Sequence, residues 1–203
     1  MISEASILFR YYSNKVPLIP IPDFYNPNFI QRGRVKRVID KNHKLHSGGT
    51  PAFFSNYGAF NFPILDDNQF FSELYDKFVI KSTELFGEFT LASDNSSTCW
   101  ASRYNKKMGK RQDSWWHNHA HTSTINAIYY LDIFNDGISF RGLNNDIYDY
   151  LPKNNELIIL PSTLIHAVQS STLRKYRYAV NMEIKTEESV TDLFSKVFKY
   201  GFS

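Results

Sequence analysis

The sequence contains a single cysteine, Cys99, among its 203 residues. One thiol excludes an intramolecular disulfide framework and a cysteine-rich zinc site, and it favours a reducing compartment. The chain also lacks any run of about 18 consecutive apolar residues, and its first residues show no basic start followed by a long apolar stretch. We therefore expect a soluble, cytoplasmic protein with no membrane segment and no signal peptide.

An excess of charge of one sign is also lacking. The 23 lysines and arginines are nearly balanced by 20 aspartates and glutamates, which leaves a formal net charge of +3. This balance predicts no strong attraction to polyanions, so nucleic acid is not an expected partner. Six basic residues do gather between Arg32 and Lys44. We interpret this segment as a solvated loop, and the alternative is a surface that attracts an acidic substrate or nucleic acid.

Apolar residues are abundant enough for a substantial core, since 42% of the chain is hydrophobic and 16% is aromatic. We expect one domain over residues 1–203. Residues 1–88 should form an irregular scaffold, with edge strands such as 6–12, followed by a helix over about 68–86 where apolar residues recur at helical spacing. An amphipathic C-terminal helix is predicted over about 189–200.

The region between these helices, about 89–185, has the texture of short strands separated by turn-forming residues. Strands at this spacing are typical of a barrel or sandwich. We therefore predict a mainly β fold with flanking helices, with strands over residues 97–104, 124–131, 138–141, 156–160 and 177–184.

Four of the six histidines lie in two places inside this region: His117, His119 and His121 in WWHNHAHTS, and His166 in LPSTLIHAV. Residues i and i+2 of an extended chain point to the same face, so two of the first three can bind one ion together. His166 can complete a set of three if its strand lies opposite, which leaves open positions for small molecules. The alternative is a surface histidine tract and an unrelated core histidine.

An alternating strand follows His166 and places Arg177, Ala179 and Asn181 on one face. A guanidinium that points into a barrel needs an anionic partner, and a dicarboxylate co-substrate would satisfy it with two parallel hydrogen bonds. Tyr130 could add a phenol hydrogen bond to the same carboxylate, although a core role is equally compatible with its position.

These stretches resemble the Fe(II)- and 2-oxoglutarate-dependent oxygenases, specifically the prolyl-hydroxylase-like branch and its small phage and bacterial members. The likeness lies in INAIYYLDIFNDGISFRG, in ELIILPSTLIHAVQS and in the RYAV that follows. It implies a double-stranded β-helix of the jelly-roll, cupin-like type, and a dioxygenase that hydroxylates a C–H bond and releases succinate and carbon dioxide. It also implies Fe(II), 2-oxoglutarate and dioxygen, with His166 as the distal ligand and Arg177 on the C5 carboxylate.

The resemblance further places Tyr130 at that carboxylate and Asn181 along the same inner face. Tyr104, just upstream of the first histidines, is one more candidate for the cofactor pocket. We interpret Trp100, Trp115 and Trp116, from the same part of the chain, as core residues rather than site residues.

The sequence departs from the family pattern at the first ligand pair, which is usually His-x-Asp or His-x-Glu. Two registers are open, either His117 with His119 or His119 with His121. All three histidines lie an odd number of residues from Tyr130, so a β-bulge is needed in either case. We favour His117 and His119, with His121 as the alternate ligand. A triad of histidines alone carries one negative charge fewer than the usual site.

Two other functions are compatible with parts of this pattern. One is a non-catalytic cupin-like barrel that binds a metal, and the other is a cupin enzyme that does not use 2-oxoglutarate. Neither requires Arg177. The sequence leaves the substrate open between a small molecule and a protein side chain, because a fold does not specify a substrate.

Overall fold

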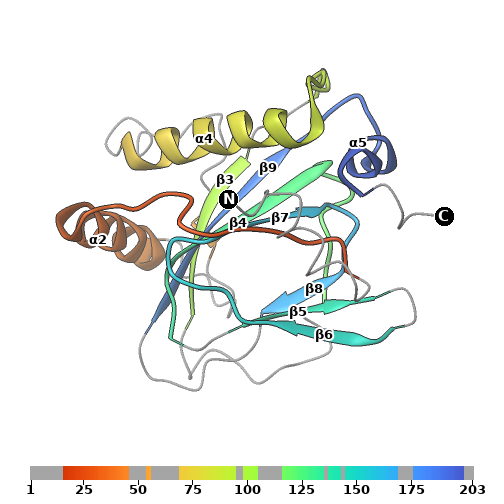
Figure 1. Ribbon diagram of the computed structural model, residues 1–203. Coiled ribbons are helices and arrows are strands. Elements are labelled where there is room, and N and C mark those ends of the chain that lie inside the picture. The colour runs from red at the N-terminus through yellow and green to blue at the C-terminus, as the bar shows by residue number, and fades with distance from the viewer. Residues whose placement is uncertain are drawn as a thin grey trace, which may run out of the picture.

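The computed structural model describes residues 16–45, 54–55, 69–94, 98–104, 116–134, 137–142, 145–168 and 176–198. The strand expected over residues 6–12 lies outside these ranges. The described chain forms two antiparallel β-sheets, with helices against the larger one (Figure 1). Within these ranges, no helix is long and apolar enough to cross a membrane.

The larger sheet has six strands, and every pairing in it is antiparallel. Its four long strands have ends within one residue of those predicted from the sequence. In spatial order the six strands are β1 (Ile19–Ile21), β7 (Leu157–Pro161), β4 (Ile125–Asp132), β9 (Arg177–Ile184), β3 (Thr98–Tyr104) and β2 (Phe54–Ser55).

The smaller sheet faces the larger one and has the order β6 (Ile147–Tyr150), β5 (Ile138–Arg141) and β8 (His166–Val168). Apolar side chains from both sheets form one buried cluster between them, including Phe140 of β5 and Ile128 of β4. Residues 125–131 of β4 are all buried, because one face of this strand meets the smaller sheet and the other meets the helices. The space between the sheets is therefore a protected interior.

Helices α4 (Gln69–Phe86) and α5 (Val190–Val197) pack into the core on the other face of the larger sheet, with α4 above the sheet and α5 at its right-hand end in Figure 1. Helix α4 was predicted from its apolar spacing. It is followed by Gly87, whose φ of 73° is the left-handed conformation that favours glycine just after a helix C-terminus. A capping box between Ser189 and Asp192 starts α5. The described helix ends at Val197, before the predicted end at residue 200.

Helix α2 (Phe29–Leu45) occupies the basic segment that we interpreted as a solvated loop, so that interpretation is wrong. Two buried residues one turn apart, Val35 and Ile39, join the core on the outer face of the larger sheet. Only this narrow apolar stripe marks the helix in the sequence, because polar residues surround it on every other face.

Two cations of α2 attach the helix to the end of β4. Arg32 donates to the carbonyl oxygen of Leu131 and, at 2.7 Å, to Oδ1 of Asn155. Lys36 forms an ion pair with Asp132, with 2.5 Å between Nζ and Oδ2. These side chains satisfy polar groups at a strand end, which explains why a strongly basic helix packs on this protein.

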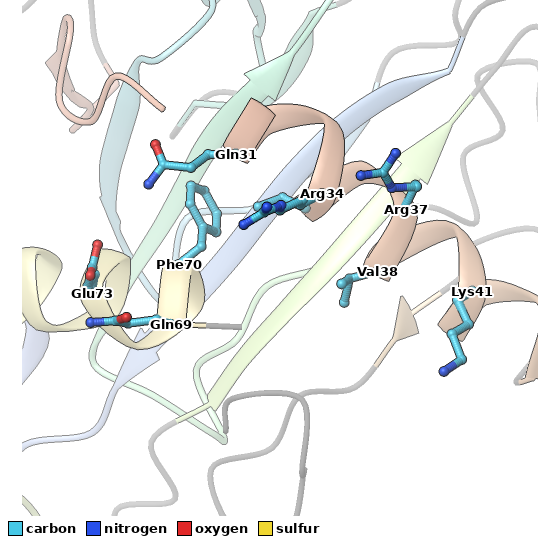
Figure 2. A pocket seen from close by; sticks show the side chains of 9 residues that line it. Gln31, Arg34, Arg37, Val38, Lys41, Gln69, Phe70 and Glu73 are labelled. Atoms are coloured by element: carbon cyan, nitrogen blue, oxygen red, sulfur yellow. The ribbon is translucent and has the colours of Figure 1, made fainter. Parts of the chain in front are cut away.

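Other cations of α2 line a cavity of about 550 Å³ between α2 and α4 (Figure 2). Arg34, Arg37 and Lys41 border it from α2, and Gln69 and Glu73 border it from α4. The helices that form this cavity pack on the outer face of the larger sheet, whereas the predicted ligand histidines lie on its inner side. The cavity is therefore separate from the histidine site.

Candidate active site

Three histidines from two distant segments meet between the sheets. His117, His119 and His166 each offer a ring nitrogen, and these atoms lie within 4.8 Å of one another. The ring centroids are 4.5 Å apart for His117 and His166, 5.1 Å for His117 and His119, and 5.3 Å for His119 and His166. Three converging imidazoles are a donor set suited to one transition-metal ion.

Backbone hydrogen bonds hold the two histidine segments together. His117 and His166 form an antiparallel bridge, with N···O distances of 3.1 and 2.9 Å. The amide of His119 donates to the carbonyl oxygen of Ser162 at 2.8 Å. The relative positions of the three histidines therefore follow from main-chain pairing, which fixes them before any ion binds.

The chain turns immediately after His119. The amides of Thr122 and Ser123 both donate to the carbonyl oxygen of His119 at 3.0 Å, and His121 is exposed in this turn. The expectation of a β-bulge before Tyr130 assumed one continuous strand, and it is wrong because this turn separates the histidines from β4. The structure brings His117 and His119 to His166, whereas the group of residues able to hold a metal does not include His121.

Hydrogen bonds to Nδ1 orient two of the rings. Nδ1 of His166 lies 2.9 Å from the carbonyl oxygen of Leu164, and Nδ1 of His119 lies 2.5 Å from Oε1 of Glu183. Both partners are acceptors, so a proton on each Nδ1 completes these contacts and Nε2 is the atom left to bind a metal. Burial, reinforced by the neighbouring His117, lowers the pKa of His166 to about 3, which leaves this ring neutral at pH 7. The residues thus fit a divalent metal ion.

Glu183 is the functional candidate that the sequence analysis missed. It lies on β9, its side chain is 4% exposed, and it contacts a histidine of the triad. The strand alternation that grouped Arg177, Ala179 and Asn181 reaches Glu183 at the next step, so this signal was present. The sequence does not show that Glu183 contacts a histidine, because the two residues lie in segments far apart in the chain.

Arg177 begins β9 and is 2% exposed. Its Nη1 donates to the carbonyl oxygen of Gly137 at 2.9 Å, which orients the guanidinium. The buried ring of Tyr130 lies beside it, with 5.9 Å between the ring centroid and the guanidinium carbon. The structure therefore brings together two of the residues that we predicted for the co-substrate.

Asn181 and Trp100 face each other across the register of β3 and β9. Together with His119 and His166 they line a small cavity between the sheets. Trp100, which we interpreted as a core residue, also lies against His119, with 5.6 Å between the ring centroids. Tyr104 pairs through its backbone with Arg177, and its side chain lies outside the described part of the structure.

Comparison with solved structures finds the same architecture in a group of oxygenases. A prolyl 4-hydroxylase of Phytophthora capsici superposes with a TM-score of 0.66 at 13% identity, over 92% of this chain and 63% of that one. The fold is that of the prolyl hydroxylases. This chain spans less than two thirds of the Phytophthora protein, so the likeness covers only part of that enzyme.

Two further structures with this fold bear on the site. A prolyl hydroxylase of Trichoplax adhaerens, in complex with a hypoxia-inducible-factor peptide, matches with a TM-score of 0.60 at 13% identity, over 90% of this chain and 89% of that one. HygX of Streptomyces hygroscopicus, with nickel and 2-oxoglutarate bound, matches with a TM-score of 0.55 at 9% identity, over 85% and 84%. No protein-family model matches the sequence, and no curated protein matches it.

Proposed function

We propose that this protein is an Fe(II)- and 2-oxoglutarate-dependent dioxygenase built on a double-stranded β-helix. It hydroxylates a C–H bond of its substrate and converts 2-oxoglutarate to succinate and carbon dioxide. The observation that carries this proposal is that three histidines able to hold a metal meet at β8 of the smaller sheet, while a buried arginine begins β9 of the facing sheet. The prolyl-hydroxylase fold supports it, since HygX of the same fold binds nickel and 2-oxoglutarate.

The metal would be held by His117, His119 and His166. Three ligands on one side leave the remaining positions open for the co-substrate and dioxygen. Fe(II) with 2-oxoglutarate bound there supplies the oxidising chemistry. The chain contributes the orientation of the imidazoles, because the carbonyl of Leu164 and the carboxylate of Glu183 hold two of the Nδ1 protons.

The co-substrate would be held at its far carboxylate by Arg177 and Tyr130. A guanidinium presents its N–H donors in a planar fork, which matches a carboxylate with two parallel hydrogen bonds. The bond to Gly137 orients this fork. The negative charge of a carboxylate would also offset that of the buried cation. Asn181 would line the pocket between this end and the histidines, and Tyr104 stays a candidate from the sequence alone.

Two aromatic side chains pack beside the less exposed histidines. Trp100 packs against His119 from β3, and Phe140 of β5 lies 6.4 Å from His166 between ring centroids. His117 is exposed, so the site would be open to solvent and substrate on the side of this histidine.

The substrate would be a small molecule or a protein side chain. The Trichoplax neighbour, in complex with a peptide, supports the second class. The site itself favours neither class, because the residues described around it bind the metal and the co-substrate.

The proposal is tested by following 2-oxoglutarate by proton NMR in aerobic protein loaded with Fe(II) and ascorbate. We expect slow formation of succinate by the protein alone, and faster formation when a peptide or metabolite panel contains the substrate. His166→Ala should abolish both. Iron-loaded protein that forms no succinate with any member of the panel would contradict the proposal.

A further inference from the structure

The carboxylate of Glu183 lies directly behind one of the metal-capable histidines. Its Oε1 is 2.5 Å from Nδ1 of His119, and the side chains are 4% and 17% exposed, respectively. Glu183 faces Asn126 across the β4–β9 register, so the carboxylate projects from the inner face of the larger sheet. A buried carboxylate in hydrogen-bonding contact with an imidazole is a strong, directional arrangement.

A buried acid at position 183 costs free energy unless its charge is compensated. A buried carboxylate loses its hydration, and only a cation and hydrogen bonds can compensate. The main chain of Glu183 is already occupied by structural pairing, since its carbonyl oxygen accepts a hydrogen bond from Tyr75 at 2.9 Å. The carboxylate points to the other side of the strand, toward the triad, where a divalent ion would provide the compensating charge.

We propose that Glu183 is a positioning residue that supplies, through His119, the negative charge that an acidic ligand would otherwise supply at position 119. This inference rests on the proposed function. The triad has three neutral donors, whereas a site with one carboxylate ligand carries one negative charge. Glu183 restores that charge from behind His119, so that the imidazole lies between the carboxylate and the metal. It also holds the proton on Nδ1 of His119, which directs Nε2 to the ion and increases its basicity.

A consequence of this arrangement is that positions 119 and 183 are coupled. An aspartate at position 119 would bring two carboxylates together in a buried place, where like charges destabilise each other. In the metal-free protein, an acid at both positions is therefore destabilising. The histidine at position 119 and the glutamate at position 183 form a matched pair.

The first test is metal affinity, measured by anaerobic titration calorimetry with Co(II) and no 2-oxoglutarate. Glu183→Gln keeps the shape of the side chain and removes its charge, and we expect Co(II) affinity to fall by about 10- to 100-fold. The visible absorption bands of bound Co(II) should shift as well, because the donor strength of His119 changes. Glu156→Gln is the matched control, since Glu156 is also 4% exposed and contacts Tyr150 and Lys153 instead of the triad.

The second test adds His119→Asp. In that background the negative charge is already at the metal and no imidazole connects Glu183 to it, so adding Glu183→Gln should change Co(II) affinity much less than it does in the natural protein. A Glu183→Gln effect that is absent in the natural protein, or that is equally large in both backgrounds, would overturn the role of Glu183 and leave the proposed function in place. A natural protein that binds no Co(II) would overturn both.

Thermal unfolding of the metal-free proteins separates this role from a structural one. A residue needed only for packing would lower stability without changing the affinity of the folded fraction or the Co(II) bands. Glu156→Gln should behave in that way, because its hydrogen bonds hold the turn before β7. Equal loss of Co(II) affinity in Glu156→Gln and Glu183→Gln would also overturn the inference.

Discussion

His117 and His166 face each other across an antiparallel bridge, although they are 49 positions apart in the sequence. Main-chain hydrogen bonds therefore set the distance between two candidate ligands, and a third bond from the amide of His119 to Ser162 places the next one. A metal site built in this way is largely preorganised, which favours tight binding because little ordering is needed when the ion arrives.

The turn after His119 predicts different effects for two neighbouring histidines. His119→Ala removes a candidate ligand, and we expect the affinity for Fe(II) or Mn(II) to fall by at least about 100-fold, in the upper range seen when a metal site is disturbed. His121→Ala changes an exposed residue and should leave the affinity unchanged. Anaerobic titration calorimetry on both variants checks this. A larger loss in His121→Ala would show that the other pair of histidines binds the metal.

The strands of this protein were predictable because their patterns are simple. β9 alternates polar and apolar residues from Arg177 onward, and β4 is a mostly apolar run between two covering layers. β6, with the sequence IYDY, was not predicted, because its residues are exposed or half-buried and its short alternation does not stand out from a loop. The spacing of apolar residues reflects which side chains are buried, so an edge strand with few buried side chains is difficult to recognise in the sequence.

The three histidines that meet in the structure could be singled out from the sequence, but their arrangement could not. Histidine spacing identified the donors, yet it left two registers open because the turn at residues 120–122 depends on hydrogen bonds to the carbonyl oxygen of His119. The contact between Glu183 and His119 joins segments 64 residues apart in the sequence. Only the pairing of β4 with β9 brings them together.

Replacement of an arginine by glutamine should have different effects on stability on the two faces of α2. Arg32→Gln removes the bonds to Leu131 and Asn155, which are partly buried, and should lower the free energy of unfolding by about 1–3 kcal/mol. Arg37→Gln changes an exposed cation that borders the cavity of Figure 2, and its effect should stay within about 0.5 kcal/mol. Urea unfolding measures both. Equal losses would contradict the assignment of Arg32 to the helix anchor.

Burial raises the pKa of the Cys99 thiol from 9.0 to about 12. The folded protein keeps this proton while the unfolded chain loses it above pH 9, so the thiol contributes stability that falls as pH rises from 9 toward 12. We expect almost no reaction of Cys99 with a thiol reagent at pH 8, and rapid reaction in urea. The rate of labelling is measured by the release of the chromophore of an aromatic disulfide reagent. Rapid labelling of the folded protein would contradict the placement of Cys99 in the core.

The most direct test of the proposed function is anaerobic titration of the Fe(II)-loaded protein with 2-oxoglutarate, followed by visible absorption. We predict a weak, saturable charge-transfer band from a chelated 2-oxo acid. The same titration of Arg177→Gln should require a much higher concentration of 2-oxoglutarate, while calorimetry shows that its metal affinity is retained. A natural protein that binds iron and shows no band would contradict the proposal and favour a metal-binding barrel that does not use 2-oxoglutarate.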